Sequence, residues 1–195
     1  MHDEQSIVKF WEWFTINEHR FIHLRSTHSP LLDLLLAKLS EVKRGLYCDL
    51  GIAHNPKILT ITACGNNSLF ETVDKIVSLA PPLSGWKFEA LLPARGFDFT
   101  TTILGCKIKA NELWFLAKKT SENQGSPKLK ISLPQGISPS KEAANAVLMI
   151  LDMGLGERET ASAFSHVEIV AYMESPEEKG FNPIVKLPEL LHGTK

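Results

Sequence analysis

Leu46-Tyr-Cys-Asp-Leu-Gly-Ile-Ala53, followed after His54-Asn55-Pro56 by Lys57-Ile-Leu-Thr-Ile-Thr-Ala63, is the stretch that decides the fold. Both runs are short and rich in residues that favour extended chain, and a turn sequence separates them, so they predict two strands. From about Asn67 to Leu79 the apolar residues recur every three or four positions, which predicts a helix. Trp86–Leu92 then alternates as a third strand. The predicted order of this stretch is strand, strand, helix, strand.

The same order of elements recurs farther along the chain. Leu113–Ala117 and Lys128–Leu133 are predicted strands around a polar loop, and Val167–Met173 is the closing strand. Between them a helix is predicted to begin near Ser138 and to end at Gly154. The two halves share negligible sequence identity, so the repeat is one of element order alone.

Two helices are expected before the first strand. The apolar stripe of residues 5–25 predicts one helix, and a second is predicted from Pro30 to about Lys43. Pro30 suits a first helical position, and Gly45 suits a helix end. Because the connection between them is short, the two helices should pack as a hairpin.

These patterns together predict an α+β fold, in which an N-terminal helical hairpin accompanies a mostly antiparallel sheet built from two strand-strand-helix-strand units. A chain of 195 residues is compatible with one domain. We expect a single domain over residues 1–195, with four parts: the hairpin (1–44), the first unit (45–110), the second unit (111–175) and a C-terminal tail (176–195).

We further expect this sheet to be covered on both faces. Alternation places one set of apolar residues toward the helices of the two units: Trp86, Phe88, Leu129, Ile131, Val167 and Ile169. The opposite face should carry Tyr47, Leu91, Trp114, Leu116, Val170 and Tyr172. Six large apolar residues are too many for a solvated face, so the helical hairpin, or a second copy of the chain, should cover it.

The composition excludes some classes of protein. Hydrophobic residues make up 44% and charged residues 22%, values typical of a globular protein. The formal net charge is −1, from 21 basic and 22 acidic residues, and a dedicated nucleic-acid protein usually has a basic excess. The locally basic stretch from Lys87 to Lys130 is expected to be a solvated face or edge-strand protection. We therefore expect no nucleic acid among the partners.

The compartment follows from the cysteines and the N-terminus. Cys48, Cys64 and Cys106 are widely spaced without a C-x-x-C pair, which predicts free, buried thiols in a reducing compartment, with no disulfide. The N-terminal residues lack the basic and apolar regions of a signal peptide, and the longest apolar stretch is too short to cross a bilayer. The sequence thus predicts a cytoplasmic protein that does not engage a membrane.

Three motifs resemble a family of uncharacterised bacterial proteins. They are Phe10-Trp-Glu-Trp-Phe14 with Asn17-Glu18, Ala80-Pro-Pro-Leu-Ser-Gly-Trp-Lys-Phe88, and Leu151-Asp-Met-Gly-Leu-Gly-Glu157 with Val167-Glu-Ile169. Arg158 to Ser162 depart from the family's pattern. The resemblance covers most of the chain and implies a bacterial cytoplasmic protein of one domain. It implies no activity, cofactor or catalytic residue.

Two patterns resemble a zinc site and a dinucleotide-binding loop, but each lacks a feature that such a site requires. His19 and His23 have the spacing of zinc ligands, but Arg20 stands where a zinc protease has its general base, and no third ligand is evident. Gly154-Leu155-Gly156 follows a helix, whereas a dinucleotide loop follows a strand. We therefore expect no metal and no cofactor.

Two groups of residues stay as candidate sites. Glu157, Glu159 and His166 gather titratable groups near a helix end, as acid–base hydrolysis requires. Glu18 interrupts the apolar stripe of the first helix, where a carboxylate must find a partner, such as a neighbouring backbone group or Arg95. Trp13, Ile16 and Leu34 point away from the apolar stripes and, with Glu18, form the predicted binding set.

The sequence therefore favours a non-enzymatic binding or regulatory protein, with a protein partner or a homodimer. The alternative is a hydrolase-type enzyme that uses Glu18, or the group of Glu157, Glu159 and His166, on a small substrate. A nucleic-acid binder that uses its basic strands is the third hypothesis.

Deletion of residues 1–44 tests the role of the helical hairpin. Since the hairpin is expected to cover an apolar face of the sheet, fragment 45–195 should be insoluble or should unfold without cooperativity in urea. A soluble fragment with a cooperative unfolding transition would show that the hairpin is an appendage.

Overall fold

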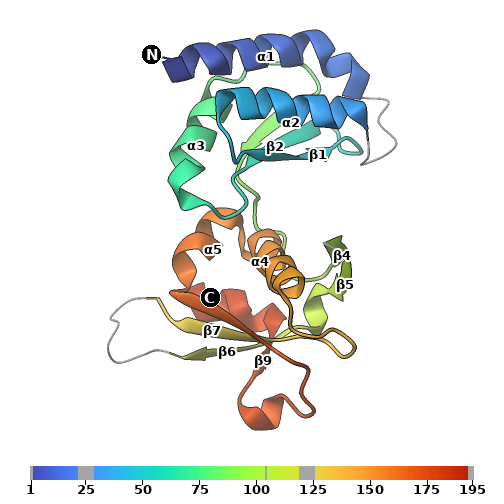
Figure 1. Ribbon diagram of the computed structural model, residues 1–195, viewed down its shortest axis with the longest axis vertical. Helices are drawn as coiled ribbons and strands as arrows, with labels where there is room; N and C mark the ends of the chain where they lie inside the picture. The colour runs from blue at the N-terminus through green and yellow to red at the C-terminus, as the bar shows by residue number, and fades with distance from the viewer. Residues whose placement is uncertain (1, 22–28, 104, 119–125, 193–195) are drawn as a thin grey trace. The chain divides into compact units, whose positions relative to one another are not determined.

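The computed structural model describes residues 2–21, 29–103, 105–118 and 126–192, and its contacts divide the chain into two compact units, residues 1–92 and 93–195 (Figure 1). The first unit consists of α1 (His2–Phe21), α2 (Pro30–Val42), β1 (Tyr47–Gly51), β2 (Lys57–Thr62), a 3₁₀ turn (Asn67–Leu69), α3 (Phe70–Ser78) and β3 (Trp86–Ala90).

The second unit begins with a hairpin of β4 (Thr100–Ile103) and β5 (Cys106–Lys109). The elements that follow are β6 (Trp114–Lys118), β7 (Lys128–Ser132), α4 (Lys141–Leu155), α5 (Glu157–Ala163), β8 (His166–Val170), β9 (Asn182–Pro183) and α6 (Leu187–His192). Further 3₁₀ turns cover Ala110–Glu112, Glu177–Lys179 and Ile184–Lys186.

The α+β class and the repeated order of elements are confirmed. In the first sheet β1 pairs antiparallel with β2, and β2 pairs parallel with β3. In the second sheet β6 pairs antiparallel with β7, and β7 pairs parallel with β8. Each parallel pair needs a helical crossover, which α3 supplies in the first unit and α4 with α5 in the second. Both units thus have the same topology, and β9 extends the second sheet beside β6.

The expectation of one continuous sheet is corrected by the strand pairing. The strands form separate sheets, and a buried cluster of unit-two residues surrounds α4. The amide of Leu91 donates to the carbonyl of Ile61 in the first unit, and the amide of Arg95 donates to the carbonyl of Met153 in the second. The chain therefore passes from one unit to the other within residues 92–94.

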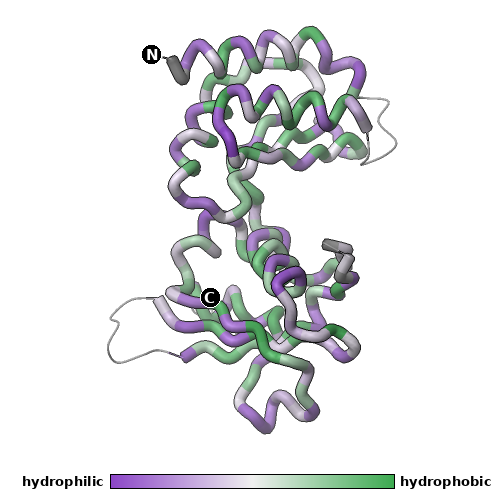
Figure 2. Tube along the Cα trace, viewed as in Figure 1, coloured by the Kyte–Doolittle hydropathy of each residue, from purple (hydrophilic) through white to green (hydrophobic). Residues whose placement is uncertain are grey.

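The helical hairpin begins as predicted. Pro30 occupies the first turn of α2, and the hydroxyl of Ser29 accepts a hydrogen bond from the amide of Leu31 (3.3 Å), which satisfies an otherwise unpaired donor. α1 is described to Phe21, and the predicted end of that helix at residue 25 lies outside the described residues. Hydrophobic and hydrophilic positions alternate along α1 in the manner of an amphipathic helix (Figure 2).

An aromatic cluster joins α1 to β3. The ring of Trp11 meets that of Phe88 edge to face, with 4.6 Å between centroids, and Phe14 meets Trp86 in the same way at 5.1 Å. Phe14 and Phe21 stack at 5.4 Å. Aromatic pairs of this geometry contribute about 0.5–1.5 kcal/mol each beyond the burial of their area.

The predicted docking face of the hairpin is therefore wrong. α1 packs on the face that carries Trp86 and Phe88, and there it meets α3, because the indole N–H of Trp11 donates to the carbonyl of Ile76 (2.8 Å). The other face of the first sheet is more polar. The strand register gives it these residues: Tyr47, Asp49, Ile58, Thr60, Thr62, Lys87 and Glu89. Thr60 and Thr62 are buried on this face.

Glu18 is half-buried at the edge of this cluster. The indole N–H of Trp86 donates to Glu18 Oε2 at 2.6 Å, and Trp86 itself is only 7% exposed. The predicted partners of Glu18 were a backbone group or Arg95, so the donor differs from the prediction. A charge-assisted hydrogen bond of this length fixes both the position of the ring and that of the carboxylate.

A double-mutant cycle of Trp86 and Glu18 tests this contact. Trp86→Ala should lower the free energy of unfolding by about 3–5 kcal/mol, as expected for emptying a large aromatic site. Trp86→Phe and Glu18→Leu should each destabilise the protein and should be coupled by about 1–3 kcal/mol, measured by urea denaturation. Trp13→Phe is the control, because it changes a tryptophan on the same helix as Glu18 but outside this hydrogen bond. Strictly additive effects would show that the contact contributes nothing to stability.

Candidate functional site

A pocket of about 440 Å³ lies along the outer side of α1 in the first unit. Its lining comes from α1 and from the chain that follows α3: Val8, Trp11, Glu12, Thr15, Ile16, Leu79 and Pro81. Five of these seven residues are apolar, Thr15 is polar, and Glu12 carries the only formal charge among them. The pocket is thus an apolar groove with one carboxylate.

Two helical rows on α1 explain how the sequence builds this groove. One row, with Trp11 and Phe14, holds the helix on the sheet. The other row is Val8, Glu12 and Ile16, which follow one another at intervals of four residues on the exposed side. α3 ends at Ser78, so Leu79 and Pro81 belong to the chain that leaves it. Ile16 is 72% exposed, although its side chain is fully apolar.

Among the described residues, no hydrogen bond or ion pair is found for the exposed carboxylate of Glu12. One turn before Val8, by contrast, Glu4 forms an ion pair with Lys75 of α3 (3.7 Å). Glu4 is therefore neutralised within the unit, whereas the carboxylate of Glu12 can accept a cation from outside.

The predicted binding set is dispersed over the first unit. Ile16 lies in the groove, whereas Trp13 packs edge to face on Phe21 at 6.3 Å between centroids. Leu34 is on α2 and is 37% exposed, and Glu18 accepts the bond from Trp86. The predicted set did not include the other groove residues, notably Val8, Glu12 and Leu79. The interval of four residues from Val8 to Glu12 and Ile16 is the signal that could have found the groove.

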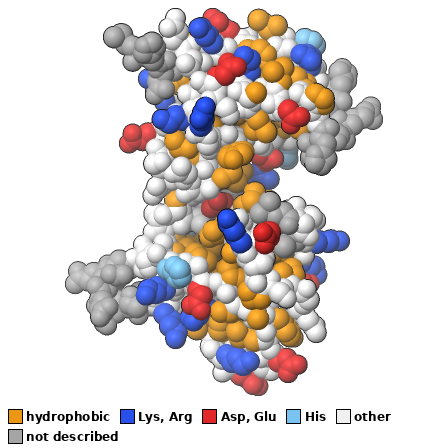
Figure 3. Space-filling model, viewed as in Figure 1, with side chains coloured by type: hydrophobic (Ala, Val, Ile, Leu, Met, Phe, Trp, Pro, Cys, Tyr) orange, Lys and Arg blue, Asp and Glu red, His pale blue; other side chains and the backbone are white. Residues whose placement is uncertain are grey.

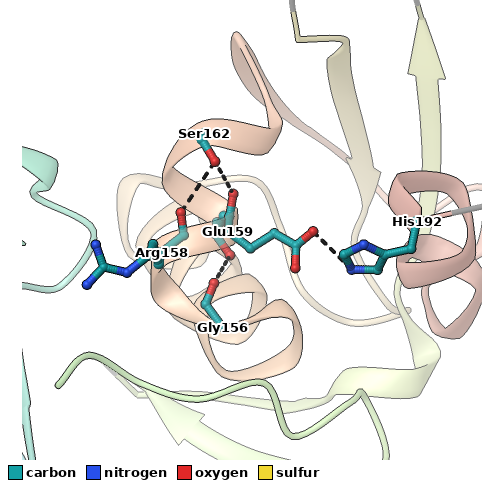
Figure 4. Close-up of polar contacts among 6 residues, drawn as sticks. Gly156, Arg158, Glu159, Ser162 and His192 are labelled. Atoms are coloured by element: carbon teal, nitrogen blue, oxygen red, sulfur yellow. Dashed lines mark hydrogen bonds and ion pairs between the residues drawn. The ribbon is translucent and has the colours of Figure 1, made fainter. Parts of the chain in front are cut away.

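The second candidate group does not meet as proposed. Glu159 forms an ion pair with Nε2 of His192 at 3.1 Å, with His192 in α6 rather than with His166 (Figure 4). Glu157 is fully buried, and His166 is exposed at the start of β8. Since residues two apart on a helix point to different sides, Glu157 and Glu159 of α5 cannot present one joint surface.

A different carboxylate accompanies Glu157, and the sequence analysis did not single it out. Asp152 of α4 is 6% exposed, and its pKa is raised from 3.8 to about 7. Burial is the main cause, the charge of Glu157 adds to it, and a hydrogen bond with the Thr160 hydroxyl opposes it. Asp152 is therefore a buried acid that holds its proton close to neutral pH.

The hydroxyl of Thr160 also donates to the carbonyl of Gly156 at 3.0 Å. A hydroxyl has a single proton, so the bond from Thr160 to the carboxyl of Asp152 competes with its bond to Gly156. A donor at that carboxyl favours the ionised form, which is why this contact lowers the pKa of Asp152 and opposes the effect of burial.

The two glycines between these carboxylates have structural roles. The ring of Phe97 lies against Gly154 so closely that a Cβ there would clash with it, and Gly156 has a φ of +92° where α4 ends and α5 begins. Gly154 therefore permits the close contact with Phe97, and Gly156 permits the junction of two helices. In the structure, Gly154-Leu155-Gly156 ends a helix and does not follow a strand, as the sequence analysis expected.

The thiols differ from one another in their surroundings. Neither Cys48 nor Cys64 is in a disulfide. Burial, with a smaller effect of Asp49, raises the pKa of the Cys48 thiol to about 12, which makes it a poor nucleophile. Cys64 is exposed, which corrects the prediction that it is buried, because it occupies a turn with a φ of +49°. The side chain of Cys106 lies outside the described part of the structure.

Within the described ranges, no three histidine, cysteine, aspartate or glutamate side chains lie close enough together to hold a metal ion. His19 is exposed on α1, and His23 falls outside those ranges. None of the described helices combines the length and the apolar character that crossing a membrane requires.

Comparison of the chain with protein-family models, with curated proteins and with solved structures finds no match.

The pKa of Asp152 predicts a pH dependence of stability. Because the folded pKa lies above the unfolded one, the protonated acid is favoured by folding, and its contribution is lost as pH rises from about 4 to 7. Between pH 5 and pH 8 this group should lower the free energy of unfolding by about 2–3 kcal/mol. Asp152→Asn should remove that loss in urea titrations at the two pH values, whereas Glu174→Gln, an exposed acid of the same unit, should retain it. Parallel pH profiles of wild type and Asp152→Asn would contradict the assignment.

Proposed function

We propose that the chain is a non-catalytic binding protein, and that the groove along α1 takes an amphipathic helix of a partner protein that carries a lysine or arginine opposite Glu12. The observation that carries this proposal is the exposed apolar row of Val8 and Ile16, interrupted by a single carboxylate that has no partner among the described residues.

The groove has the form that helix recognition uses. Partner helices bind through apolar residues at intervals of three and four, and Val8, Glu12 and Ile16 repeat at the same interval over about 12 Å of α1. Burial of apolar surface contributes about 25 cal/mol per Å², so covering the side chains of Val8, Ile16 and Leu79 favours association.

The wall of the groove is also rigid. Trp11 is buried beneath it, with its indole bonded to Ile76 and its ring against Phe88. A wall that is already ordered loses little conformational freedom when a partner binds.

Glu12 decides which helix fits. A carboxylate inside an apolar contact is costly unless a cation meets it, so a partner with lysine or arginine at that position is favoured over a purely apolar helix. A second copy of the chain fits less well. Glu12 lies midway between Val8 and Ile16, so a twofold axis through the groove would bring the two Glu12 carboxylates together.

The hydrolase alternative has less support. The carboxylate of Glu18 is held by the indole of Trp86, and Glu159 is paired with His192. Asp152 has the raised pKa of a general acid, but it is nearly inaccessible, and it does not line the groove along α1.

Synthetic helical peptides test the proposal without knowledge of the natural partner. The probe is an amphipathic peptide with leucines at intervals of three and four and lysines beside them, and the comparison peptide has glutamate in place of lysine. We expect the lysine peptide to bind at least tenfold more tightly by fluorescence anisotropy, and to shift the amide resonances of α1 and of residues 79–81.

Matched variants localise the binding. Ile16→Lys should abolish it, and Glu12→Lys should reverse the preference between the two peptides. Leu34→Lys places the same change at an apolar position on α2 outside the groove and should have no effect. Equal effects of Ile16→Lys and Leu34→Lys would overturn the proposal. A dimer in sedimentation experiments that Ile16→Lys dissociates would assign the groove to a second copy instead.

A further inference from the structure

The open face of the second sheet carries a row of basic side chains and, beyond its opposite end, a pocket with aromatic rings. Strand register places Lys118 of β6 directly opposite Lys128 of β7, and Lys128 next to His166 of β8. All three side chains lie in one row across three strands and are exposed. Figure 3 shows a histidine and basic side chains close together in the lower part of the view, with an acidic side chain among them.

This row is unfavourable for the isolated sheet. Like charges directly opposite each other in an antiparallel pair repel, and no ion pair of Lys118 or Lys128 with another described residue is found. In the next row, two residues along, Lys130 and Glu168 form an ion pair at 2.9 Å. The basic row therefore keeps a charge that an anionic ligand can neutralise, whereas the adjacent row is already neutral.

A pocket of about 480 Å³ opens beyond the opposite end of the same face. Trp114 and Tyr172 contribute aromatic rings to its lining, and Tyr172 is 46% exposed. The other lining residues mix polar and apolar groups: Asn111, Glu112, Ser132, Leu133, Pro134, Gln135, Met173 and Pro176. The amides of Asn111 and Gln135 offer both donors and acceptors, although Asn111 already donates to Asp98 (3.3 Å).

We propose that this face binds single-stranded nucleic acid, with phosphates on the row of Lys118, Lys128 and His166 and a base in the pocket of Trp114 and Tyr172. The two ends are four residues apart along β6, or about 13 Å, which a few nucleotides of extended strand can span. A basic track combined with an aromatic platform is the arrangement by which sheets bind single strands.

The pocket distinguishes this ligand from other polyanions. An acidic peptide has no flat π-face to stack on Trp114, and its carboxylates would compete with Glu112 for Lys109, with which Glu112 forms an ion pair (3.2 Å). A nucleobase stacks on an indole, and its amino group can donate to a carboxylate or amide oxygen. In a duplex the bases are stacked on one another and cannot enter the pocket.

The near-zero net charge of the whole chain does not oppose this inference. It excludes a protein whose entire surface is basic, whereas single-strand binding needs a local track. The strand register, which the composition does not contain, brings the three basic side chains into one row.

The experiment uses the full chain and fluorescently labelled oligonucleotides of about 12 nucleotides, oligo(U) and oligo(dT), in anisotropy titrations at 50 and 200 mM salt. We expect saturable binding that weakens with salt. The double variant Lys118→Glu/Lys128→Glu should weaken binding at least tenfold at low salt and reduce the slope of log affinity against log salt by about 1–1.5. Lys141→Glu/Lys186→Glu, with two exposed lysines of the same unit, is the matched control and should change neither value appreciably.

Aromatic variants separate stacking from charge. Trp114→Leu should lower the affinity about 5- to 100-fold and leave the salt slope unchanged, whereas Trp114→Phe should restore most of the affinity because it keeps a π-face. Circular dichroism and urea unfolding check that each variant is folded.

Three results would overturn the inference. These are no binding at 50 mM salt, the same loss in the control double variant, and displacement of the oligonucleotide by poly-glutamate as effectively as by unlabelled oligonucleotide. The last result would assign the face to acidic peptides.

Discussion

The packing of α1 on β3 through aromatic rings is the contact on which the first unit depends. Trp11 and Phe14 meet Phe88 and Trp86 edge to face. The indole N–H of Trp11 donates to a carbonyl of α3, and the indole N–H of Trp86 donates to Glu18. These contacts fix the helix both in position and in rotation about its axis. The exposed row of Val8, Glu12 and Ile16 has a defined direction only because the opposite side of α1 is held in this way.

The two units use one topology with different means of stabilisation. In the first, the helix α1 before the repeat supplies aromatic side chains to the sheet, and only the short α3 makes the crossover. In the second, the long helix α4 supplies an aliphatic core to β6 and β7, with Val147, Ile150 and Leu151 buried against Leu129 and Ile131. The repeated order of elements therefore constrains the connections between strands, but it leaves the composition of the core open.

Much of the fold could be predicted from periodicity, because long alternating or helical runs report directly on burial. The α+β class, the repeated unit, and the position of Pro30 at the start of α2 followed from such runs. The short elements α5, β4, β5 and β9 did not, since two to seven residues carry too little pattern. The docking face of the hairpin was also missed, because alternation shows that Trp86 and Phe88 share a face but does not show which helix covers it.

The candidate sites were harder to predict for the same physical reason. Ile16 was identified because it is apolar and off the buried stripe, but Leu79 joins it only through the packing of α3 beside α1. Lys118, Lys128 and His166 are separated by up to 48 positions in the chain, and strand register alone brings them into one row. Asp152 gained its raised pKa from burial beside Glu157, which depends on the helix junction at Gly156.

The short passage between the units has a consequence for avidity. Leu91 is bonded to the first unit and Arg95 to the second, so the chain joining them cannot stretch beyond about 15 Å. A macromolecule that reached both units would meet its second site at an effective concentration in the millimolar range, provided that it could span the two. Two contacts that are each weak would then give a long-lived complex, and lengthening residues 92–94 with glycine and serine would shorten its lifetime without altering either surface.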